Sequence, residues 1–396
     1  MSRKVVIASG VRTAIGDFGG SLAGISPCDL AASVAREAIA RAGISADDIG
    51  QTVFGNVIHT APEDMYISRV AAIRAGVPDT VPALTLNRLC GSGLQAIVTA
   101  AEQIMLGNAD ITLAGGAESM SRAGHLLTQA RHGQKMGDTV AVDMMIGALT
   151  DPFGNGHMGI TAENIAERGG IDRAAQDAFA LESHKRAAEA IAEGRFVEQI
   201  LPLTVKQGRK EFVFDTDEHV RPDVKLEDMA KLRPAFRKDG SVTAGNASGL
   251  NDAGAAVVLM EEGVAKARGV EPLARIVAYG LGGVAPEVMG LGPVPATQQA
   301  LSRAGLTVSD LDVIESNEAF AAQACAVSQQ LGFPADKVNP NGGAIALGHP
   351  VGASGAVILI KTMYELKRTG GRYGLATMCI GGGQGIAVII ENPAHG

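Results

Sequence analysis

Along most of the chain, short apolar runs alternate with longer segments in which apolar and polar residues follow a helical pattern. A short apolar run bounded by turn residues is typical of a buried strand, whereas the longer pattern is typical of a helix. The stretch Val-Val-Ile-Ala-Ser-Gly, residues 5–10, predicts the first strand. Strands that alternate with helices predict an α/β protein with mixed, largely parallel sheets and helices on both faces.

The alternation occurs twice, which indicates an internal duplication. Residues 40–49 and 302–311 follow similar Ala-rich helical patterns, and each leads into a short apolar strand. These strands end at Asn56 and Asn317, so the two asparagines occupy corresponding places.

Each half continues with a Gly-rich turn that opens an apolar helix, and then with an apolar strand that runs into glycines. The turns with their helices are residues 90–98 and 348–359, and the strands are residues 111–118 and 375–383. We therefore expect two similar halves that pack face to face. Active sites of α/β folds lie at strand ends and helix N-termini, so residues from both halves should meet there.

Residues 121–245 fit neither copy of the repeat. They contain polar helical sequence at 172–191 and a charged, irregular stretch at 208–228, whereas residues 246–267 return to apolar character. The predicted organisation is an N-terminal half, an inserted loop domain and a C-terminal half, formed by residues 1–120 plus 246–272, 121–245 and 273–396, respectively.

The composition is that of a well-buried globular protein, because 46% of the 396 residues are apolar and 19% are charged. A net charge of −8 without any Lys/Arg cluster beside aromatic residues gives nucleic-acid binding no support. No apolar run reaches the roughly 20 residues that span a bilayer. Neither end carries a targeting sequence, so we expect no membrane association and a cytoplasmic location.

The cysteines are far apart in the sequence, at Cys28, Cys90, Cys325 and Cys379, and they include no Cys-x-x-Cys pair. This spacing suggests neither a zinc site nor a disulfide framework. Cys90 precedes an apolar helix and is followed by Gly91, Ser92 and Gly93. A helix N-terminus lowers a thiol pKa, and the glycines would let a substrate approach the backbone. The alternative for a lone cysteine is a small buried apolar residue.

Two further residues follow the same logic. His349 lies in a Gly- and Pro-rich loop before a helix, where an imidazole with a near-neutral pKa can act as a general base or make a structural hydrogen bond. Cys379 ends a strand before a glycine run whose N–H groups can bind an oxyanion. The run is no dinucleotide fingerprint, because too little chain follows for a crossover helix. Asn317, also at a strand end, is either functional or a helix cap.

Together these features closely resemble the thiolase family, and the resemblance covers nearly the whole chain. The motifs that carry it are N-R-L-C-G-S-G-L-Q-A (87–96), G-G-A-E-S-M-S (115–121), H-M-G-x-T-A-E-N (157–164), T-A-G-N-A-S-G-L-N-D (243–252), N-E-A-F-A (317–321), G-G-A-I-A-L-G-H-P-x-G-A-S-G (342–355) and C-I-G-G-G-x-G (379–385). The resemblance is closest to the bacterial biosynthetic β-ketothiolases that feed polyhydroxyalkanoate synthesis. It implies the duplicated five-layer αβαβα architecture of the thiolase fold.

The resemblance also implies a mechanism. Cys90 would carry the acyl group, His349 would accept its proton, and Cys379 would move the proton at Cα of the second acetyl group. One oxyanion would be bound by His349 and a water held by Asn317, and the other by the N–H groups of Cys90 and Gly381. No metal or redox cofactor would be required.

Acetyl-CoA, acyl-CoA and CoA are the expected ligands, lying across the loop domain. The CoA-binding positions carried over from the family are Leu149, His157, Met158, Arg221, Phe236, Ala244, Ser248, Met289, Ala319 and Phe320. The resemblance further implies a homotetramer, a dimer of dimers, with residues 125–137 as the tetramerisation loop.

The sequence before His157 lacks the tyrosine often found in acetyl-specific relatives and has glycines instead. We hypothesise that this widens the pocket for acyl groups longer than acetyl. Three other classes compete with a thiolase. Ketoacyl and hydroxymethylglutaryl-CoA synthases lack a counterpart of Cys379, a non-catalytic acyl-binding scaffold would not need all three reactive residues, and a dehydrogenase rests on glycine runs alone.

Overall fold

In the computed structural model, which describes residues 3–395, the chain forms the predicted succession of strands and helices. The N-terminal half contains β1 (Val5–Thr13), β2 (Gly16–Asp17), α1 (Pro27–Arg41), β3 (Gln51–Gly55), α2 (Ile67–Arg74), β4 (Ala83–Leu86), α3 (Ser92–Met105), β5 (Ile111–Ser119), β13 (Asn251–Glu261) and α8 (Glu262–Ala267). The C-terminal half contains β14 (Ala274–Gly283), α9 (Pro293–Ala304), β15 (Val313–Ser316), α10 (Ala321–Leu331), α11 (Ala344–Leu347), α12 (Val351–Thr369), β16 (Tyr373–Ile380) and β17 (Gln384–Glu391).

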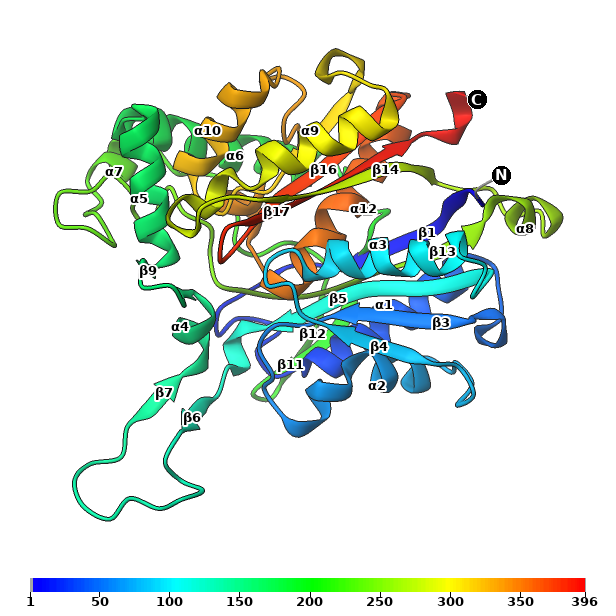
Figure 1. Ribbon diagram of the computed structural model, residues 1–396, viewed down its shortest axis with the longest axis horizontal. Helices are drawn as coiled ribbons and strands as arrows, with labels where there is room; N and C mark the ends of the chain where they lie inside the picture. Colours follow the sequence, from blue (N-terminus) through cyan, green and yellow to red (C-terminus); the bar gives the residue numbers. More distant parts are fainter. Residues whose placement is uncertain (1–2, 396) are drawn as a thin grey trace.

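Between β5 and β13 the chain leaves the sheet for a long excursion. It contains β6 (His125–Leu127), β7 (Ala141–Asp143), α4 (Met144–Ala148), β8 (Thr150–Asp151), β9 (Gly156–His157), α5 (Met158–Gly169), α6 (Arg173–Ala192), β10 (Ile200–Leu201), β11 (Leu203–Gln207), β12 (Lys210–Phe214) and α7 (Leu226–Ala230). The β6–β7 hairpin extends away from the body of the molecule as an arm (Figure 1).

The strands of both halves belong to one hydrogen-bonded array in the order β15-β16-β17-β14-β1-β13-β5-β3-β4. The two halves join where β1 pairs with β14 through Val6 and Ile7. The expectation of largely parallel sheets is wrong. Along this order the outer pairs β3–β4, β3–β5 and β15–β16 are parallel and the central pairs are antiparallel, while the short β10 adds a parallel partner to the end of β1. In the C-terminal half the last two strands, β16 and β17, form a hairpin, which is necessarily antiparallel. In the N-terminal half β13 returns antiparallel to β5 after the inserted segment.

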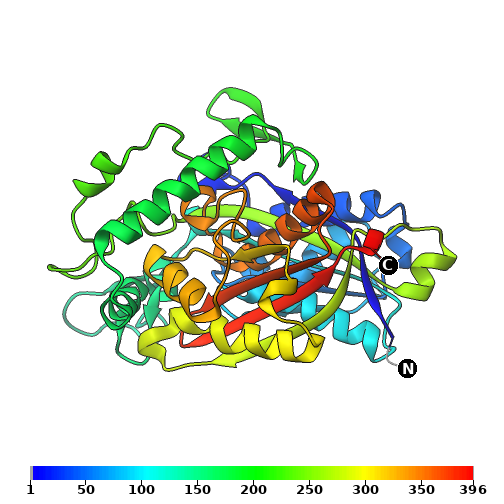
Figure 2. The same cartoon turned by 90° about the horizontal axis from the view of Figure 1, so that it is seen from above.

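Helices form three layers around the two parts of the sheet (Figures 1 and 2). α1 covers the outer face of the N-terminal part, α9 covers the outer face of the C-terminal part, and α3 and α12 contact each other between them. The two central helices cross at glycines. A Cβ on Gly93 would lie 3.0 Å from the carbonyl oxygen of Gly352, and a Cβ on Gly355 would lie 2.4 Å from the nitrogen of Leu94. This arrangement is the αβαβα layering of the thiolase fold.

The duplication is visible in details that the repeat predicted. Each half has a short 3₁₀ turn with a capping box, Ser45 with Asp48 in one half and Thr307 with Asp310 in the other. Both turns lead into the parallel strands β3 and β15, as the matching segments 40–49 and 302–311 indicated.

No helix among residues 3–395 is both long and apolar enough to span a bilayer.

Candidate active site

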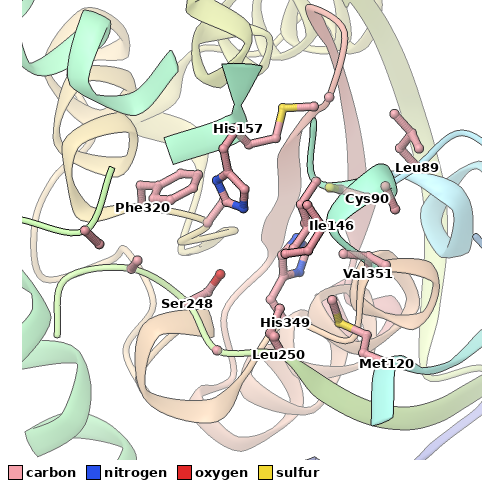
Figure 3. A pocket seen from close by; sticks show the side chains of 18 of the residues that line it. Leu89, Cys90, Met120, Ile146, His157, Ser248, Leu250, Phe320, His349 and Val351 are labelled. Atoms are coloured by element: carbon pink, nitrogen blue, oxygen red, sulfur yellow. The ribbon is translucent and has the colours of Figure 1, made fainter. Parts of the chain in front are cut away.

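A cavity of about 390 Å³ opens where the ends of both halves meet the inserted segment (Figure 3). Thirteen of the predicted site residues line it: Cys90, Leu149, His157, Met158, Arg221, Phe236, Ala244, Ser248, Met289, Ala319, Phe320, His349 and Gly381. Cys379 and Asn317 do not line this cavity. The structure therefore brings together residues that lie as far apart as positions 90 and 381.

Cys90 lies just before α3, two residues ahead of its first residue. The expectation of a lowered thiol pKa is wrong for the resting site. Burial raises the pKa of Cys90 to about 11, although the N–H groups of Gly381 and of Cys90 itself oppose the shift. The loss of hydration outweighs the helix N-terminus, so Cys90 rests as a thiol and needs a base to become a nucleophile.

The sequence predicts that the glycines after Cys90 let a substrate approach the backbone, but the structure gives them another role. A Cβ on Gly91 would lie 2.5 Å from Cδ1 of Ile380, and Gly93 faces the backbone of α12. The space beside these glycines is filled by the C-terminal half, so they are required for close contact between the two halves.

His349 lies two residues before α12 and is buried. Its Nδ1 lies 2.6 Å from Oγ of Ser354, and that hydroxyl donates to the carbonyl oxygen of Pro350 at 3.0 Å. Because the hydroxyl has one proton, Nδ1 must be the donor to Ser354, and Nε2 is left unprotonated. Nε2 is buried and has no hydrogen-bond partner among the described residues.

The near-neutral pKa expected for His349 is also wrong, because burial lowers it to about 4. A buried imidazole loses more hydration energy as a cation than as a neutral ring. His349 is therefore neutral at pH 7, and its free Nε2 can accept a proton. Figure 3 shows its ring on the same side of the cavity as Cys90.

Cys379 is the last but one residue of β16 and is buried behind the cavity. Its thiol donates to Oε1 of Gln323 at 3.5 Å, a long contact. Burial raises the pKa of this thiol well above its ordinary value, and a negative charge on Cys90 would raise it further. The glycine run after Cys379 forms the turn of the β16–β17 hairpin, which confirms that it is no dinucleotide fingerprint.

Asn317 follows β15 and is buried against a second, small cavity of about 10 Å³, lined also by Gly348, Pro350 and Ser354. That volume holds roughly one water molecule. The capping alternative is wrong, because the next helix begins only at Ala321, with Phe320 as its N-cap. Nδ2 of Asn317 has no hydrogen-bond partner among the described residues.

An aromatic wall lies across the cavity from Cys90. The ring of His157 stacks on Phe236 with centroids 4.7 Å apart, and Phe236 meets Phe320 edge-on at 6.1 Å. Nδ1 of His157 accepts the N–H of Gly159 at 3.1 Å, so its Nε2 carries the proton and is a donor. Ser248 stands beside this wall, and its backbone N–H is bonded to Ala319 at 3.0 Å (Figure 3).

The polar groups of the lining carry no negative charge. None of the described lining residues is Asp or Glu, while Arg221 and three histidines are present. The rest is mainly apolar. Such a cavity suits a ligand with a long, mostly uncharged arm and an anionic end.

Sequence reasoning missed several lining residues, namely Val57, Leu89, Met120, Ile146, Ala148, His219, Ala235, Ala247, Gly249, Leu250 and Val351. Leu89, Met120 and Val351 lie within or beside the recognised motifs, so a wider reading of each motif would have found them. It also missed Gln323, whose amide contacts Cys379 and donates to the carbonyl oxygen of Asn317 at 3.2 Å. His219 had no signal in the sequence, since its placement depends on contact with Asp17.

The glycines proposed to widen the pocket have another role. Gly154 and Gly156 have φ values of 92° and 79°, and they form the turn between β8 and β9. Among the described residues, positions 150–156 do not line the cavity. Their positive φ values give these glycines a backbone role of their own. The wider pocket stays a prediction.

A nucleophilic thiol, a neutral imidazole from the other half of a duplicated α/β fold and a second thiol define a cysteine-dependent acyltransferase. Family models for the thiolase N-terminal domain and the thiolase C-terminal domain match residues 5–263 and 270–392. The chain belongs to the thiolase family.

Its relatives make the class more specific. The chain is 62% identical over 392 residues to the beta-ketothiolase BktB of Cupriavidus necator, covering 99% of this chain and all of that protein. The acetyl-CoA acetyltransferase of Bacillus anthracis superposes with a TM-score of 0.97 at 46% identity and 99% coverage of both chains. Human mitochondrial 3-ketoacyl-CoA thiolase in complex with CoA superposes with a TM-score of 0.96 at 43% identity and 98% coverage of both chains. The protein is an acyltransferase that condenses acetyl-CoA with an acyl-CoA, as a β-ketothiolase.

Proposed function

We propose that this enzyme interconverts two short acyl-CoA molecules with a 3-ketoacyl-CoA and CoA, through an acyl group carried on Cys90. The observation that carries this proposal is that Nε2 of His349 and Nδ2 of Asn317 are among the buried polar atoms that have no partner in the described residues. Buried polar groups are nearly always hydrogen-bonded, and an exception beside two thiols indicates a site that binds reacting atoms.

In the first half-reaction, Nε2 of His349 takes the proton of Cys90, and the thiolate attacks the thioester carbonyl of the first acyl-CoA. The carbonyl oxygen becomes an oxyanion, which the N–H groups of Cys90 and Gly381 would stabilise. When the C–S bond to CoA breaks, the departing thiolate takes a proton from Cys379, and the acyl group remains on Cys90.

In the second half-reaction, the thiolate of Cys379 removes a proton from Cα of acetyl-CoA. A thiol with a raised pKa gives a strongly basic thiolate, so the burial of Cys379 suits this step. The enolate oxygen would be stabilised by protonated His349 and by a water bound to Asn317. The enolate carbon then attacks the acyl carbonyl, the C–S bond to Cys90 breaks, and its thiolate recovers a proton from His349.

The CoA arm would lie along the aromatic wall, with Ser248 beside its amides and Arg221 near its phosphates. The absence of acidic residues from the described lining supports this orientation. The chemistry needs no metal or redox cofactor, because the thiols and the imidazole move every proton. A cytoplasmic location stays a prediction, consistent with four free thiols.

We further propose a homotetramer in which the β6–β7 arm contacts another subunit. The arm exposes apolar side chains that a monomer would leave in water: Leu126 (50% exposed), Leu127 (48%), Met136 (88%) and Val140 (70%). Removing residues 128–139 should lower the mass measured by light scattering, while the far-UV spectrum is retained. An unchanged mass would contradict the role of the arm.

The test of the proposed function uses purified enzyme, CoA and 3-ketoacyl-CoA substrates of four, five, six and ten carbons. Loss of the 3-ketoacyl absorbance is expected with the four- to six-carbon substrates, and mass spectrometry of the quenched enzyme should find the acyl group on Cys90. Folded enzyme with a free Cys90 thiol that turns over none of them would overturn the proposal. Orders-of-magnitude preference for four carbons over five would rule out a widened acyl pocket.

A further inference from the structure

Glu118 is a fully buried acid at the end of β5 that no step above uses. Its Oε1 accepts hydrogen bonds from Nδ2 of Asn56 at 3.0 Å and from the N–H of Ile58 at 3.1 Å. Its Oε2 accepts from the N–H groups of Val57 at 3.1 Å and of Gly352 at 2.9 Å. Four N–H donors occupy the four acceptor positions of a carboxylate and leave no place for a proton.

The bond to Gly352 crosses from one half of the molecule to the other. Gly352 is the second residue of α12, and the helix has no side-chain cap of its own because Pro350 occupies the N-cap position. The first N–H groups of a helix lack partners within it, and the helix dipole favours an anion there. Glu118 therefore acts as the cap of α12, although it belongs to the N-terminal half.

The capped helix holds His349. The residue lies two positions before α12, and its Nδ1 is bonded to Ser354 in the first turn. The same carboxylate binds the segment Asn56 to Ile58, whose Val57 lines the cavity. Glu118 thus fixes the base from one half relative to the cavity wall from the other.

Glu118 is also close enough to Cys90 for its charge to act there. Burial is the main reason for the raised pKa of Cys90, and the negative charge of Glu118 adds to it. Burial and the charge of Asp64 raise the pKa of Glu118. Protonation would turn an O–H towards one of the four N–H donors, so these donors keep the group a carboxylate. Asp64 accepts hydrogen bonds from the hydroxyl of Thr60 and the thiol of Cys28, and it is not among the residues that line the cavity.

The duplication shows which residue of the C-terminal half is equivalent to Glu118. In the parallel pairs, Gly55 lies opposite Gly116 and Ser316 lies opposite Thr377. Counting two residues along β5 and β16 makes Glu118 the counterpart of Cys379. Each half therefore places one acid or thiol at the same strand end, facing the same centre.

We propose that Glu118 is a positioning residue of the thiolase reaction: its carboxylate caps α12 across the boundary between the halves and so fixes the position of His349 at the cavity that Cys90 also lines. This inference rests on the proposed roles of His349 and Cys90. It assigns Glu118 no contact with substrate.

The first test is the variant Glu118→Gln in the full-length enzyme. A Gln amide turns an NH₂ group towards N–H donors, so two acceptor positions are lost and α12 is released. We expect kcat for thiolysis to fall by about 100-fold, the effect of a small displacement of a catalytic group, with little change in KM. Removing the negative charge should also lower the pKa of Cys90, so its alkylation by iodoacetamide at pH 9 should become faster.

Two variants separate positioning from a general loss of stability. Glu163 is likewise buried, and it accepts N–H bonds from Ser241 at 2.9 Å and from Val242 at 2.9 Å in the inserted segment. Glu163→Gln should lower the melting temperature without accelerating the alkylation of Cys90. Glu118→Asp keeps the charge but is one methylene shorter, so kcat should fall while the alkylation rate stays at the wild-type value.

Equal kcat and equal alkylation rates in Glu118→Gln and Glu163→Gln would overturn the proposal. If Glu118→Gln does not fold, Glu118→Asp serves as the test, and a wild-type kcat in that variant would overturn the proposal. Failure of the proposed function is a separate outcome, since it would appear as wild-type enzyme that forms no acyl–Cys90.

Discussion

The two halves of this enzyme place equivalent backbone segments at the active site, but the polar side chains on these segments differ in how far they are hydrogen-bonded. In the N-terminal half, Nδ2 of Asn56 donates to Ala117 and Glu118, both at 3.0 Å, and Glu118 accepts four bonds. In the C-terminal half, Nδ2 of the matching Asn317 has no partner among the described residues. The thiol of Cys379, which matches Glu118, makes one long contact.

This difference indicates that equivalent positions have diverged into a structural set in the N-terminal half and a catalytic set in the C-terminal half. Nδ2 of Asn56 and both oxygens of Glu118 are hydrogen-bonded, although Oδ1 of Asn56 has no partner among the described residues, so the N-terminal set serves as a support. Unpartnered groups cost about 1–3 kcal/mol each and persist where something else binds them. The helix starts diverge in the same sense, since corresponding positions hold Cys90 before α3 and His349 before α12. One half supplies the nucleophile and the other supplies its base.

The most severe test of this contrast removes the nucleophile. Replacing Cys90 with Ser should reduce kcat by up to about 10⁶-fold, because a hydroxyl is far less nucleophilic than a thiol beside the same base. The fold should be unaffected, since serine is nearly isosteric. Steady-state thiolysis and the far-UV spectrum measure the two effects. Substantial remaining activity would mean that Cys90 does not carry the acyl group.

The next change divides the two half-reactions. Cys379→Ser should still form acyl–Cys90, although more slowly, while condensation falls by about 10² to 10⁴-fold, the usual contribution of a general base. Mass spectrometry of the acyl-enzyme and a coupled condensation assay report on the two steps separately. Condensation at the wild-type rate would contradict the role assigned to this strand end.

The matched asparagines offer the sharpest comparison. Asn317→Ala should lower kcat by about 10² to 10³-fold with little effect on stability, because an oxyanion donor is lost but no hydrogen bond of its Nδ2 is broken. Asn56→Ala should instead lower the free energy of unfolding by about 1–3 kcal/mol, because it leaves acceptors unpaired. Urea unfolding and steady-state kinetics of both variants would show whether kcat falls in Asn317→Ala and stability falls in Asn56→Ala. Equal effects of both variants on stability would break the contrast between the halves.

The smallest predicted effect concerns pH. The pKa of His349 is lowered from 6.5 to about 4 in the folded protein, so between these values only the unfolded chain binds the proton. This residue therefore stabilises the fold fully above pH 6.5 and less as the pH falls towards 4. At pH 5 the loss should be about 2 kcal/mol. Urea unfolding at pH 7 and pH 5 should show a shallower pH dependence in His349→Asn than in the wild type.

Much of the fold was predictable from the sequence, because the same strand, turn and helix patterns occur in both halves. The segments ending at Asn56 and Asn317, the turns before α3 and α12, and the apolar strands that run to Glu118 and Cys379 all have the predicted places. The antiparallel centre of the sheet was not predictable, because strand direction depends on connections that leave no pattern in a single strand.

The site was predictable in its residues but not in its electrostatics. The residues identified through the family resemblance line one cavity, except for Asn317 and Cys379, which lie behind it. The pKa values of Cys90 and His349 were mispredicted because a local sequence shows a helix start but not the burial of the group. Ser354 and Gln323 were missed because they act through hydrogen bonds formed only after folding.

The position of β1 at the centre of the sheet has a consequence for folding during synthesis. Val6 pairs with both Met260 and Arg275, so this part of β1 meets its partners only after more than 250 further residues have been synthesised. At about 5–20 residues per second, that interval lasts roughly 13–50 s. Until then this apolar part of β1 must remain exposed or be shielded by a chaperone, and a truncation before β13 leaves it without either neighbouring strand.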